Sequence, residues 1–172
     1  MALLYLMRHA KSAWDGPPLD DHDRPLAPRG RRAARAMARH FRTLKADPEL
    51  ILCSSAVRTR ETLDLIMPGF SRAPIIAIER GLYLAPPGSI LARLREVESS
   101  VEKVLVLGHN PGLHELAIML AGSGSAKSVA ALARKFPTAS LATYEFDGSW
   151  AELGPEDTRL RAFVTPADLH DD

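Results

Sequence analysis

Three apolar runs of the sequence each lead into side chains that can bind or transfer a phosphoryl group. The runs are residues 3–7, 50–53 and 103–107, and the side chains that follow them are Arg8, His9, Arg58 and His109. Continuous apolar runs of this length are typical of strands that are buried on both faces of a parallel sheet. Because ligands bind beyond the carboxyl ends of such strands, we expect the four side chains to converge at one sheet edge.

A convergent cluster of this composition is suited to a phosphate dianion. Guanidinium groups match phosphate oxygens in a bidentate manner, and the helix N-termini that follow the strands add partial positive charge. A neutral imidazole is a nucleophile near pH 7, and no separate base is needed to activate it. The alternative is that Arg8 and Arg58 only pair with surface carboxylates, and the convergence of all four residues argues against it.

The elements that must position these residues follow from hydrophobic periodicity and from turn-forming residues. We expect strands at residues 3–7, 50–53, 74–78, 103–107, 140–146 and 159–164. We expect helices at residues 29–44, 57–67, 89–97, 111–120 and 129–135. Strands alternate with helices almost throughout, which predicts an α/β fold, a three-layer α/β/α sandwich with a largely parallel central sheet. No linker divides the chain, so we expect one domain over residues 1–172.

Local signals refine three of the helices and one loop. Ser89 is the expected N-cap of its helix, and Asn110 is an expected N-cap with Pro111 at the first helical position. The helix at residues 29–44 has an apolar stripe formed by Ala34, Met37, Ala38 and Phe41. Its arginines lie largely away from that stripe, as a solvated face or as a docking surface for an acidic protein. Residues 11–28 are rich in proline and aspartate and are expected to form a loop.

Composition excludes several classes of protein. The 172 residues include 22 Lys and Arg, 21 Asp and Glu, and one Cys. A single Cys excludes an internal disulfide and any metal site with several Cys ligands, and a net charge of +1 argues against a nucleic-acid-coating protein. No apolar stretch approaches the roughly 20 residues that span a bilayer, and no signal peptide is recognised. We therefore expect a cytoplasmic protein that binds neither membrane nor nucleic acid.

Three motifs of the chain resemble those of the histidine phosphatase superfamily, which has the phosphoglycerate-mutase-like fold. They are Leu6-Met7-Arg8-His9-Ala10, Ser54-Ser-Ala-Val-Arg58-Thr-Arg-Glu-Thr62 and Gly108-His109-Asn-Pro-Gly112. The short length and the segment Asp23-Arg24-Pro25-Leu26 are most similar to the SixA-like phosphohistidine phosphatases. The resemblance extends from residue 3 to about residue 146. It departs at Ala10, where the superfamily normally has Gly, and this suggests a slightly different loop geometry.

The resemblance implies a role for each convergent residue. His9 would be the nucleophile and would form a covalent phosphohistidine, which water then hydrolyses. Arg8, Arg58 and a protonated His109 would hold the non-bridging oxygens. Ser12 is a candidate donor to the phosphoryl group. No metal and no other cofactor is implied.

The motifs do not assign a residue that protonates the leaving group as the general acid. Many members of the superfamily place a carboxylate after the third strand, and Glu79 is the candidate here, with a solvent-exposed strand end as the alternative. Phosphohistidine has a labile P–N bond and a readily protonated leaving group, so a site specialised for it could work without a strong acid. The role of Glu79 is therefore coupled to the class of substrate.

Several other motifs are assigned no chemistry. Cys53 is followed by Arg58 after only four residues, one fewer than cysteine phosphatases need, and we expect a buried core thiol. Residues 121–128 resemble a P-loop but follow a helix and have Ala in place of both required glycines. Residues 21–23 (Asp-His-Asp) lie in the predicted loop, where Asp23 and Arg24 could shape the pocket entrance. We expect His40 and His170 at the surface, and His114 in a supporting position.

The sequence therefore predicts a metal-independent phosphatase that acts on phosphohistidine in a protein or on a small phosphorylated metabolite. A phosphomutase is an alternative, although the chain is too short for a large substrate-enclosing insertion. A non-catalytic phosphate- or phosphoprotein-binding module is a further alternative, and the presence of His9 as an in-line nucleophile argues against it.

Overall fold

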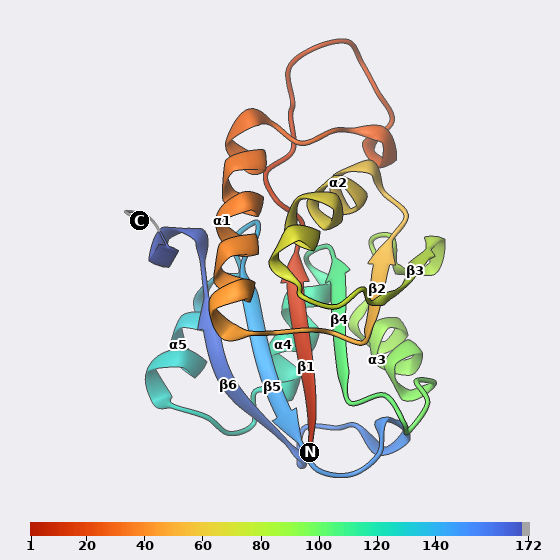
Figure 1. The fold of residues 1–172 in the computed structure, drawn as a ribbon, viewed down its shortest axis with the longest axis vertical. Coiled ribbons are helices and arrows are strands. Elements are labelled where there is room, and N and C mark those ends of the chain that lie inside the picture. Colours follow the sequence, from red (N-terminus) through yellow and green to blue (C-terminus); the bar gives the residue numbers. More distant parts are fainter. Residues whose placement is uncertain (170–172) are drawn as a thin grey trace.

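The computed structural model describes residues 1–169 and shows a six-stranded sheet in the order β3-β2-β4-β1-β5-β6 (Figure 1). The strands are β1 (Ala2–Arg8), β2 (Leu50–Ser54), β3 (Ile75–Glu79), β4 (Lys103–Gly108), β5 (Leu141–Phe146) and β6 (Thr158–Val164). The pairs among β1 to β4 are parallel, and β5 is antiparallel to both of its neighbours, β1 and β6. The predicted, largely parallel sheet is therefore confirmed.

Helices cover both faces of this sheet (Figure 1). They are α1 (Pro28–Leu44), α2 (Val57–Ile66), α3 (Pro87–Arg95), α4 (Gly112–Leu120) and α5 (Ala126–Arg134). Buried side chains of α1 and α2 share one hydrophobic core with one face of the sheet, and those of α3, α4 and α5 share a second core with the other face. The chain thus forms the predicted three-layer α/β/α sandwich.

The first strand shows why the apolar runs are continuous. Leu4 and Leu6 belong to the core beneath α3 and α4, whereas Tyr5 and Met7 belong to the core beneath α1 and α2. Successive side chains of a strand point to opposite faces, so a strand covered on both sides needs apolar residues at every position. Burial on both faces also fixes the strand end, and with it the position of the residues that follow.

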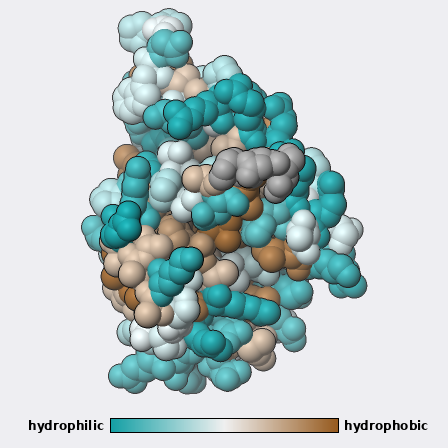
Figure 2. Space-filling model, turned by 90° about the vertical axis from the view of Figure 1, so that its left-hand side faces the viewer, coloured by the Kyte–Doolittle hydropathy of each residue, from teal (hydrophilic) through white to brown (hydrophobic). Residues whose placement is uncertain are grey.

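The apolar stripe of α1 is confirmed, because Ala34, Met37, Ala38 and Phe41 are all buried. The helix also presents exposed arginines to solvent, namely Arg29, Arg32, Arg35, Arg39 and Arg42. Hydrophilic side chains cover much of the upper part of the side of the molecule seen in Figure 2, and apolar side chains gather lower down. Within residues 1–169, none of the helices is both long and apolar enough to cross a membrane.

The predicted N-cap at Ser89 is wrong. Helix α3 begins at Pro87, two residues earlier, and Pro86 occupies the N-cap position without a side-chain hydrogen bond. Proline suits the first helical position because its fixed φ is helical and its missing N–H would be unpaired there. Two consecutive prolines therefore start this helix before the serine is reached.

The predicted N-cap at Asn110 is also wrong. Helix α4 begins at Gly112, and Pro111, joined to Asn110 by a cis peptide bond, precedes it. The Asn110 side chain donates to the carbonyl oxygen of Phe136 at 3.0 Å. Its amide therefore ties the end of β4 to the segment before β5.

The carboxyl ends of β2, β4 and β1 lie next to one another, because these strands are neighbours in the sheet. Residues 11–27 leave this edge after β1 and return to it before α1 (Figure 1). A single bridge between Ser12 and Leu26 closes the loop at its base, and Asp21–Asp23 form a short 3₁₀ turn within it. The predicted loop is confirmed, and its return brings polar residues back to the edge.

Candidate active site

His9 lies at the end of β1 as a buried, neutral imidazole. Its side chain is anchored by the Ala10 carbonyl oxygen, which lies 2.7 Å from Nδ1. A carbonyl only accepts hydrogen bonds, so Nδ1 carries the proton and Nε2 keeps its lone pair. Burial lowers the pKa of His9 to about 3, and the charges of Arg8, Arg58 and Arg24 add to this effect. The geometry therefore gives a nucleophilic nitrogen over the whole neutral pH range.

The backbone around His9 is held from two sides. The His9 N–H donates to the Gly108 carbonyl oxygen at 3.2 Å, and the Ala10 N–H donates to Thr62 Oγ1 at 3.0 Å. Thr62 lies in α2 and in turn donates to the carbonyl oxygen of Arg58 at 2.7 Å. Ala10, where the superfamily has Gly, is completely buried. These bonds connect the segment that carries the nucleophile to the end of β4 and to α2.

His109 follows β4 and lies beside His9, with 5.3 Å between the ring centroids. Its Nε2 is 2.7 Å from Ser54 Oγ, which accepts a hydrogen bond from the Ala56 N–H at 3.3 Å. We assign the Ser54 hydroxyl as the donor to Nε2, which places the proton of His109 on Nδ1. Burial is the largest cause that lowers the pKa of His109 to about 3, and the charge of Arg58 adds to it. This low pKa does not favour the predicted protonated His109, whose protonation beside a bound phosphoryl group stays a prediction.

Two arginines flank the histidines. Arg8 donates through Nη1 to the Phe136 carbonyl oxygen at 3.2 Å, and its Nε is buried without a hydrogen-bond partner among the described residues. Arg58 is the more buried, with a side chain only 5% exposed. Its Nη1 donates to the Asp21 carbonyl oxygen at 2.7 Å and its Nη2 to the Asp21 carboxylate at 2.9 Å.

A cavity of about 220 Å³ joins these residues at the predicted sheet edge. Its lining includes Arg8, His9, Ser12, Arg58 and His109. The structure therefore brings together five of the six residues predicted for the site. A cavity of this size, lined by two guanidinium groups and two imidazoles, is chemically suited to a phosphoryl group.

Glu79, the sixth predicted residue, is not among the residues that line this cavity. It ends β3, an edge strand, and its two carboxylate oxygens accept three hydrogen bonds of 2.8 to 3.1 Å from Arg93 of α3. Glu79 was predicted from its position at a strand end, but the sequence did not indicate that Arg93 of α3 would bind its carboxylate.

The loop supplies two residues that the strand-end argument missed, Asp21 and Arg24. Arg24 donates to Ser12 Oγ, to the Ala13 carbonyl oxygen at 3.2 Å and to Asp21 Oδ1 at 3.0 Å. It also stacks on the exposed Trp14, 3.3 Å from the ring centroid. Both Asp21 and Arg24 line the cavity. The Asp-Arg-Pro-Leu segment was the available signal, and it pointed correctly to Arg24 but to Asp23 in place of Asp21.

Cys53 and His114 do not line the smaller cavity and stabilise the fold. Cys53 is buried, and burial raises the pKa of its thiol to about 12, so the predicted inert core thiol is confirmed. His114 contacts the Leu132 carbonyl oxygen through Nε2 at 2.7 Å, which ties α4 to α5. His40, expected at the surface, is half-buried. His170 lies outside the described residues.

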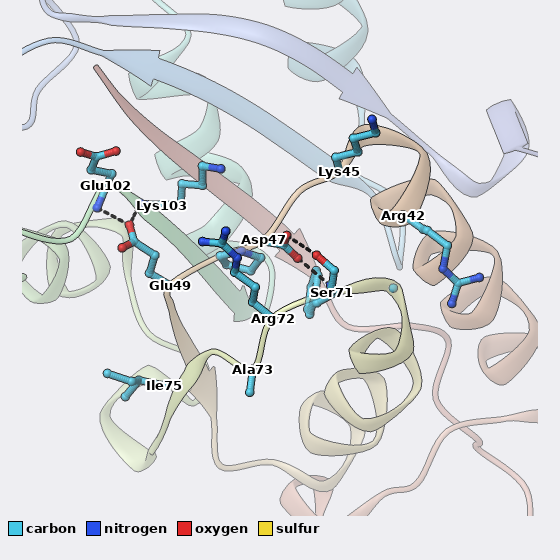
Figure 3. Close-up of a pocket in the computed structure, with 13 residues that line it drawn as sticks. Arg42, Lys45, Asp47, Glu49, Ser71, Arg72, Ala73, Ile75, Glu102 and Lys103 are labelled. Atoms are coloured by element: carbon cyan, nitrogen blue, oxygen red, sulfur yellow. Dashed lines mark hydrogen bonds between the residues drawn. The ribbon is translucent and has the colours of Figure 1, made fainter.

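A larger cavity of about 940 Å³ lies at the opposite, amino-terminal edge of the sheet (Figure 3). Its carboxylates bond to neighbouring loops, since Asp47 accepts hydrogen bonds from Ser71 and Glu49 accepts them from the N–H groups of Glu102 and Lys103. No group of three or more His, Cys, Asp or Glu residues suited to a metal ion occurs within residues 1–169. The smaller cavity, which the two histidines and two arginines line, is the candidate active site.

Comparison with known proteins identifies a matching family and similar structures. The family model described as histidine phosphatase superfamily (branch 1) matches residues 4–81. The uncharacterized protein Rv1276c of Mycobacterium tuberculosis is 42% identical over 163 residues, which cover 93% of this chain and 99% of that protein.

Two solved structures are similar over the whole fold. The putative phosphohistidine phosphatase SixA from Nakamurella multipartitia has a TM-score of 0.84 and 30% identity, and the match covers 96% of each chain. The putative phosphohistidine phosphatase SixA from Agrobacterium tumefaciens has a TM-score of 0.79 and 30% identity, with 96% of this chain and 98% of that chain covered.

Proposed function

Because this chain belongs to the histidine phosphatase superfamily and is SixA-like, we propose that it hydrolyses its substrate through a covalent phosphohistidine on His9. The observation that carries the proposal is the tautomer of His9. The Ala10 carbonyl holds the proton on Nδ1, and the low pKa keeps Nε2 unprotonated beside two arginines. A binding site for phosphate needs the cations, but it does not need a nucleophile held in this way.

In the first step, the His9 Nε2 lone pair attacks phosphorus and forms a P–N bond as the bond to the leaving atom breaks. The leaving atom takes that electron pair and a proton from solvent, and the water that attacks in the second step returns a proton to solvent. Arg8 and Arg58 stabilise the negative charge on the non-bridging oxygens. His109 contributes as a neutral donor through Nδ1–H. In the second step, water attacks phosphorus, the P–N electron pair returns to Nε2, and inorganic phosphate is released.

The preferred substrate is phosphohistidine in a protein. An alkoxide leaving group requires a general acid, whereas an imidazole leaves readily once protonated. Of the carboxylates considered, Glu79 is bound to Arg93 and Asp21 has a lowered pKa, so neither is a ready proton donor. Two SixA structures that share 30% identity with this chain are described as putative phosphohistidine phosphatases, which supports the same substrate class. A small phosphate ester is the second candidate.

Activity and its dependence on His9 provide the first test. We expect the purified protein to hydrolyse p-nitrophenyl phosphate in the presence of EDTA, and His9→Ala to lower kcat by at least about 10³-fold. His40→Gln is the matched control, because His40 lies on α1 away from the cavity, and its rate should stay near wild type. Phosphate binding without hydrolysis in the wild type would instead indicate a binding module.

The covalent intermediate and the substrate class need separate measurements. Rapid quenching should trap a phosphoenzyme that is acid-labile and base-stable, and its absence from the wild type would exclude His9 as the nucleophile. The rates on a phosphohistidine protein and on a panel of phosphate esters should then be compared side by side. We expect the phosphohistidine protein to give the higher kcat/KM, and the reverse order would favour a small ester.

A further inference from the structure

We propose that Asp21 is a positioning residue that fixes the guanidinium groups of Arg58 and Arg24 around a bound phosphate. Asp21 belongs to the loop and not to a strand end, and no motif named it as a site residue. The proposal deepens the proposed function and rests on it only in taking phosphate as the anion that this cavity binds.

The contacts of Asp21 reach both arginines at once. Its carbonyl oxygen and its Oδ2 accept hydrogen bonds from Arg58 at 2.7 and 2.9 Å, and its Oδ1 accepts one from Arg24 at 3.0 Å. Oδ2 also accepts a hydrogen bond from the Tyr83 hydroxyl. Main-chain and side-chain oxygens of a single residue therefore set the orientation of two cations that line the same cavity.

Charge supports the same role. The Arg58 side chain is 5% exposed, and a guanidinium buried to this degree needs a counter-charge and fixed hydrogen bonds. Asp21 is the only carboxylate that pairs with Arg58 within the described residues. Burial alone would raise the pKa of the Asp21 carboxyl, but hydrogen bonds from Tyr83 and Arg58 and the charges of both arginines outweigh it and lower the pKa. Asp21 therefore stays ionised at neutral pH.

Asp21 can position Arg58 without competing with the substrate for the N–H groups of its guanidinium. An arginine guanidinium has five N–H groups, and Asp21 accepts from two of those on Arg58. The guanidinium keeps three further N–H groups, so the contact does not consume its capacity to bind phosphate oxygens. A low pKa also argues against Asp21 as the donor of a proton to the leaving group.

Tyr83 holds Asp21 in turn. Its hydroxyl donates to the carboxylate, and its ring packs edge-on against His109 and His22, with centroid distances of 5.4 and 4.8 Å. His22 contacts Ser55 Oγ through Nε2 at 2.8 Å and so fastens the 3₁₀ turn to the segment after β2. Asp21 is thus anchored at both its backbone and its carboxylate.

The test compares Asp21→Asn with Asp23→Asn in the full chain. Asp23 lies on the same 3₁₀ turn and is exposed, and its carboxylate contacts only His22 among the described residues, so its variant makes the same change in charge without touching an arginine. Calorimetry with inorganic phosphate measures the affinity without requiring hydrolysis. We expect Asp21→Asn to weaken phosphate binding about 10- to 100-fold, the range for loss of charge-assisted hydrogen bonds, and Asp23→Asn to stay within about 2-fold.

Kinetics distinguish the alternatives. We expect Asp21→Asn to lower kcat/KM by the same factor for p-nitrophenyl phosphate and for a phosphohistidine peptide, mainly through KM. Tighter phosphate binding would identify Asp21 as a competitor of the substrate, and a loss confined to esters would identify it as a general acid. An equal loss of phosphate affinity in Asp23→Asn would show that the effect comes from the change in overall charge. Each of these three results overturns the proposal.

Tyr83→Phe keeps the test decisive if the Asp21 variants fail to fold. This change removes one hydroxyl that donates to Asp21 and leaves the ring packing in place. We expect a smaller loss of phosphate affinity in the same direction and an unchanged thermal midpoint. Wild-type phosphate affinity in Tyr83→Phe would contradict the proposal. A wild-type protein that binds phosphate without hydrolysing it would defeat the proposed function alone.

Discussion

His9 and His109 remain uncharged for the same physical reason. Each is buried at a strand end beside arginines, and the pKa of each falls to about 3. Their hydrogen-bond partners then separate their roles, because a carbonyl fixes the proton of His9 on Nδ1 and the Ser54 hydroxyl approaches Nε2 of His109. With this assignment, His9 keeps a lone pair on Nε2, and His109 keeps an N–H at Nδ1, a buried atom without a hydrogen-bond partner among the described residues.

Glu79 gives the first prediction at the residue scale. Because its carboxylate is held by Arg93 and does not line the cavity, we expect Glu79→Gln to change kcat/KM by less than about 3-fold for both an ester and a phosphoramidate. The half-exposed ion pair contributes at most about 1 kcal/mol to the free energy of unfolding. Arg93→Gln removes the same pair and should match both results. Slower hydrolysis of the ester alone would restore Glu79 as the general acid.

The residues at strand ends could be predicted from the sequence, whereas their partners could not. Arg8, His9 and His109 directly follow buried apolar runs, so the topology alone places them together. Asp21 reaches the site only because its loop folds back over the sheet edge. Hydrophobic periodicity does not predict how a loop folds back. A strand-end position located Glu79 in the chain, but it did not show which way the side chain would be held.

At the scale of elements, the turn between β4 and α4 is built on close packing of the backbone. A Cβ added at Gly112 would overlap the carbonyl oxygen of Ala85, whereas a Cβ at Gly108 would meet nothing nearer than a Leu113 methyl at 3.8 Å. The turn carries His109 between these two glycines. The backbone approach at Gly112 therefore fixes where β4 delivers the histidine.

The two glycines form a matched pair of variants. We expect Gly112→Ala to lower the free energy of unfolding by about 2–3 kcal/mol, because the backbone must move, and to reduce activity by displacing His109. Gly108→Ala should be tolerated, with a change below about 1 kcal/mol and activity near wild type. Urea unfolding and p-nitrophenyl phosphate hydrolysis measure both effects. Equal losses in the two variants would show that the Ala85 approach is not the constraint.

Helix starts were predicted less well than the helices themselves. The apolar stripe of α1 is fixed by packing against the sheet, so its periodicity is recorded at many positions. A cap depends on one local contact, and at Ser89 and Asn110 neighbouring prolines and the Phe136 carbonyl decided the outcome. A helix that is predicted from many apolar positions is therefore predicted more reliably than a cap that is predicted from one residue. A tertiary contact can replace a single capping contact without changing the rest of the helix.

At the scale of the whole molecule, a net charge of +1 conceals a strongly basic site. The small cavity is lined by Arg8, Lys11, Arg24 and Arg58, with Asp21 as its carboxylate. The rest of the molecule balances this charge at a distance, and solvent screens it. Burial of the two histidines, together with the cations around them, lowers their affinity for protons and so couples the site to the stability of the whole fold.

This coupling predicts a loss of stability in mild acid. The pKa values of His9 and His109 are about 3 in the folded protein and ordinarily near 6.5, so below pH 6.5 the unfolded chain binds more protons. The free energy of unfolding should therefore be at its full value above pH 6.5 and fall as the pH decreases, by roughly 1 kcal/mol per pH unit for each histidine.

Urea unfolding between pH 7.5 and 5.0 measures this slope. The window isolates histidines, because Asp21 and Asp47, whose pKa values are lowered, stabilise the fold down to about pH 4 and lose that contribution only below it. The pKa of His40 is also lowered by burial, so His40→Gln measures its separate share. His109→Gln should flatten the slope by the share of one histidine, because glutamine does not titrate. An unchanged slope in His109→Gln would mean that His109 is protonated in the folded protein and would restore it as a cationic ligand for phosphate.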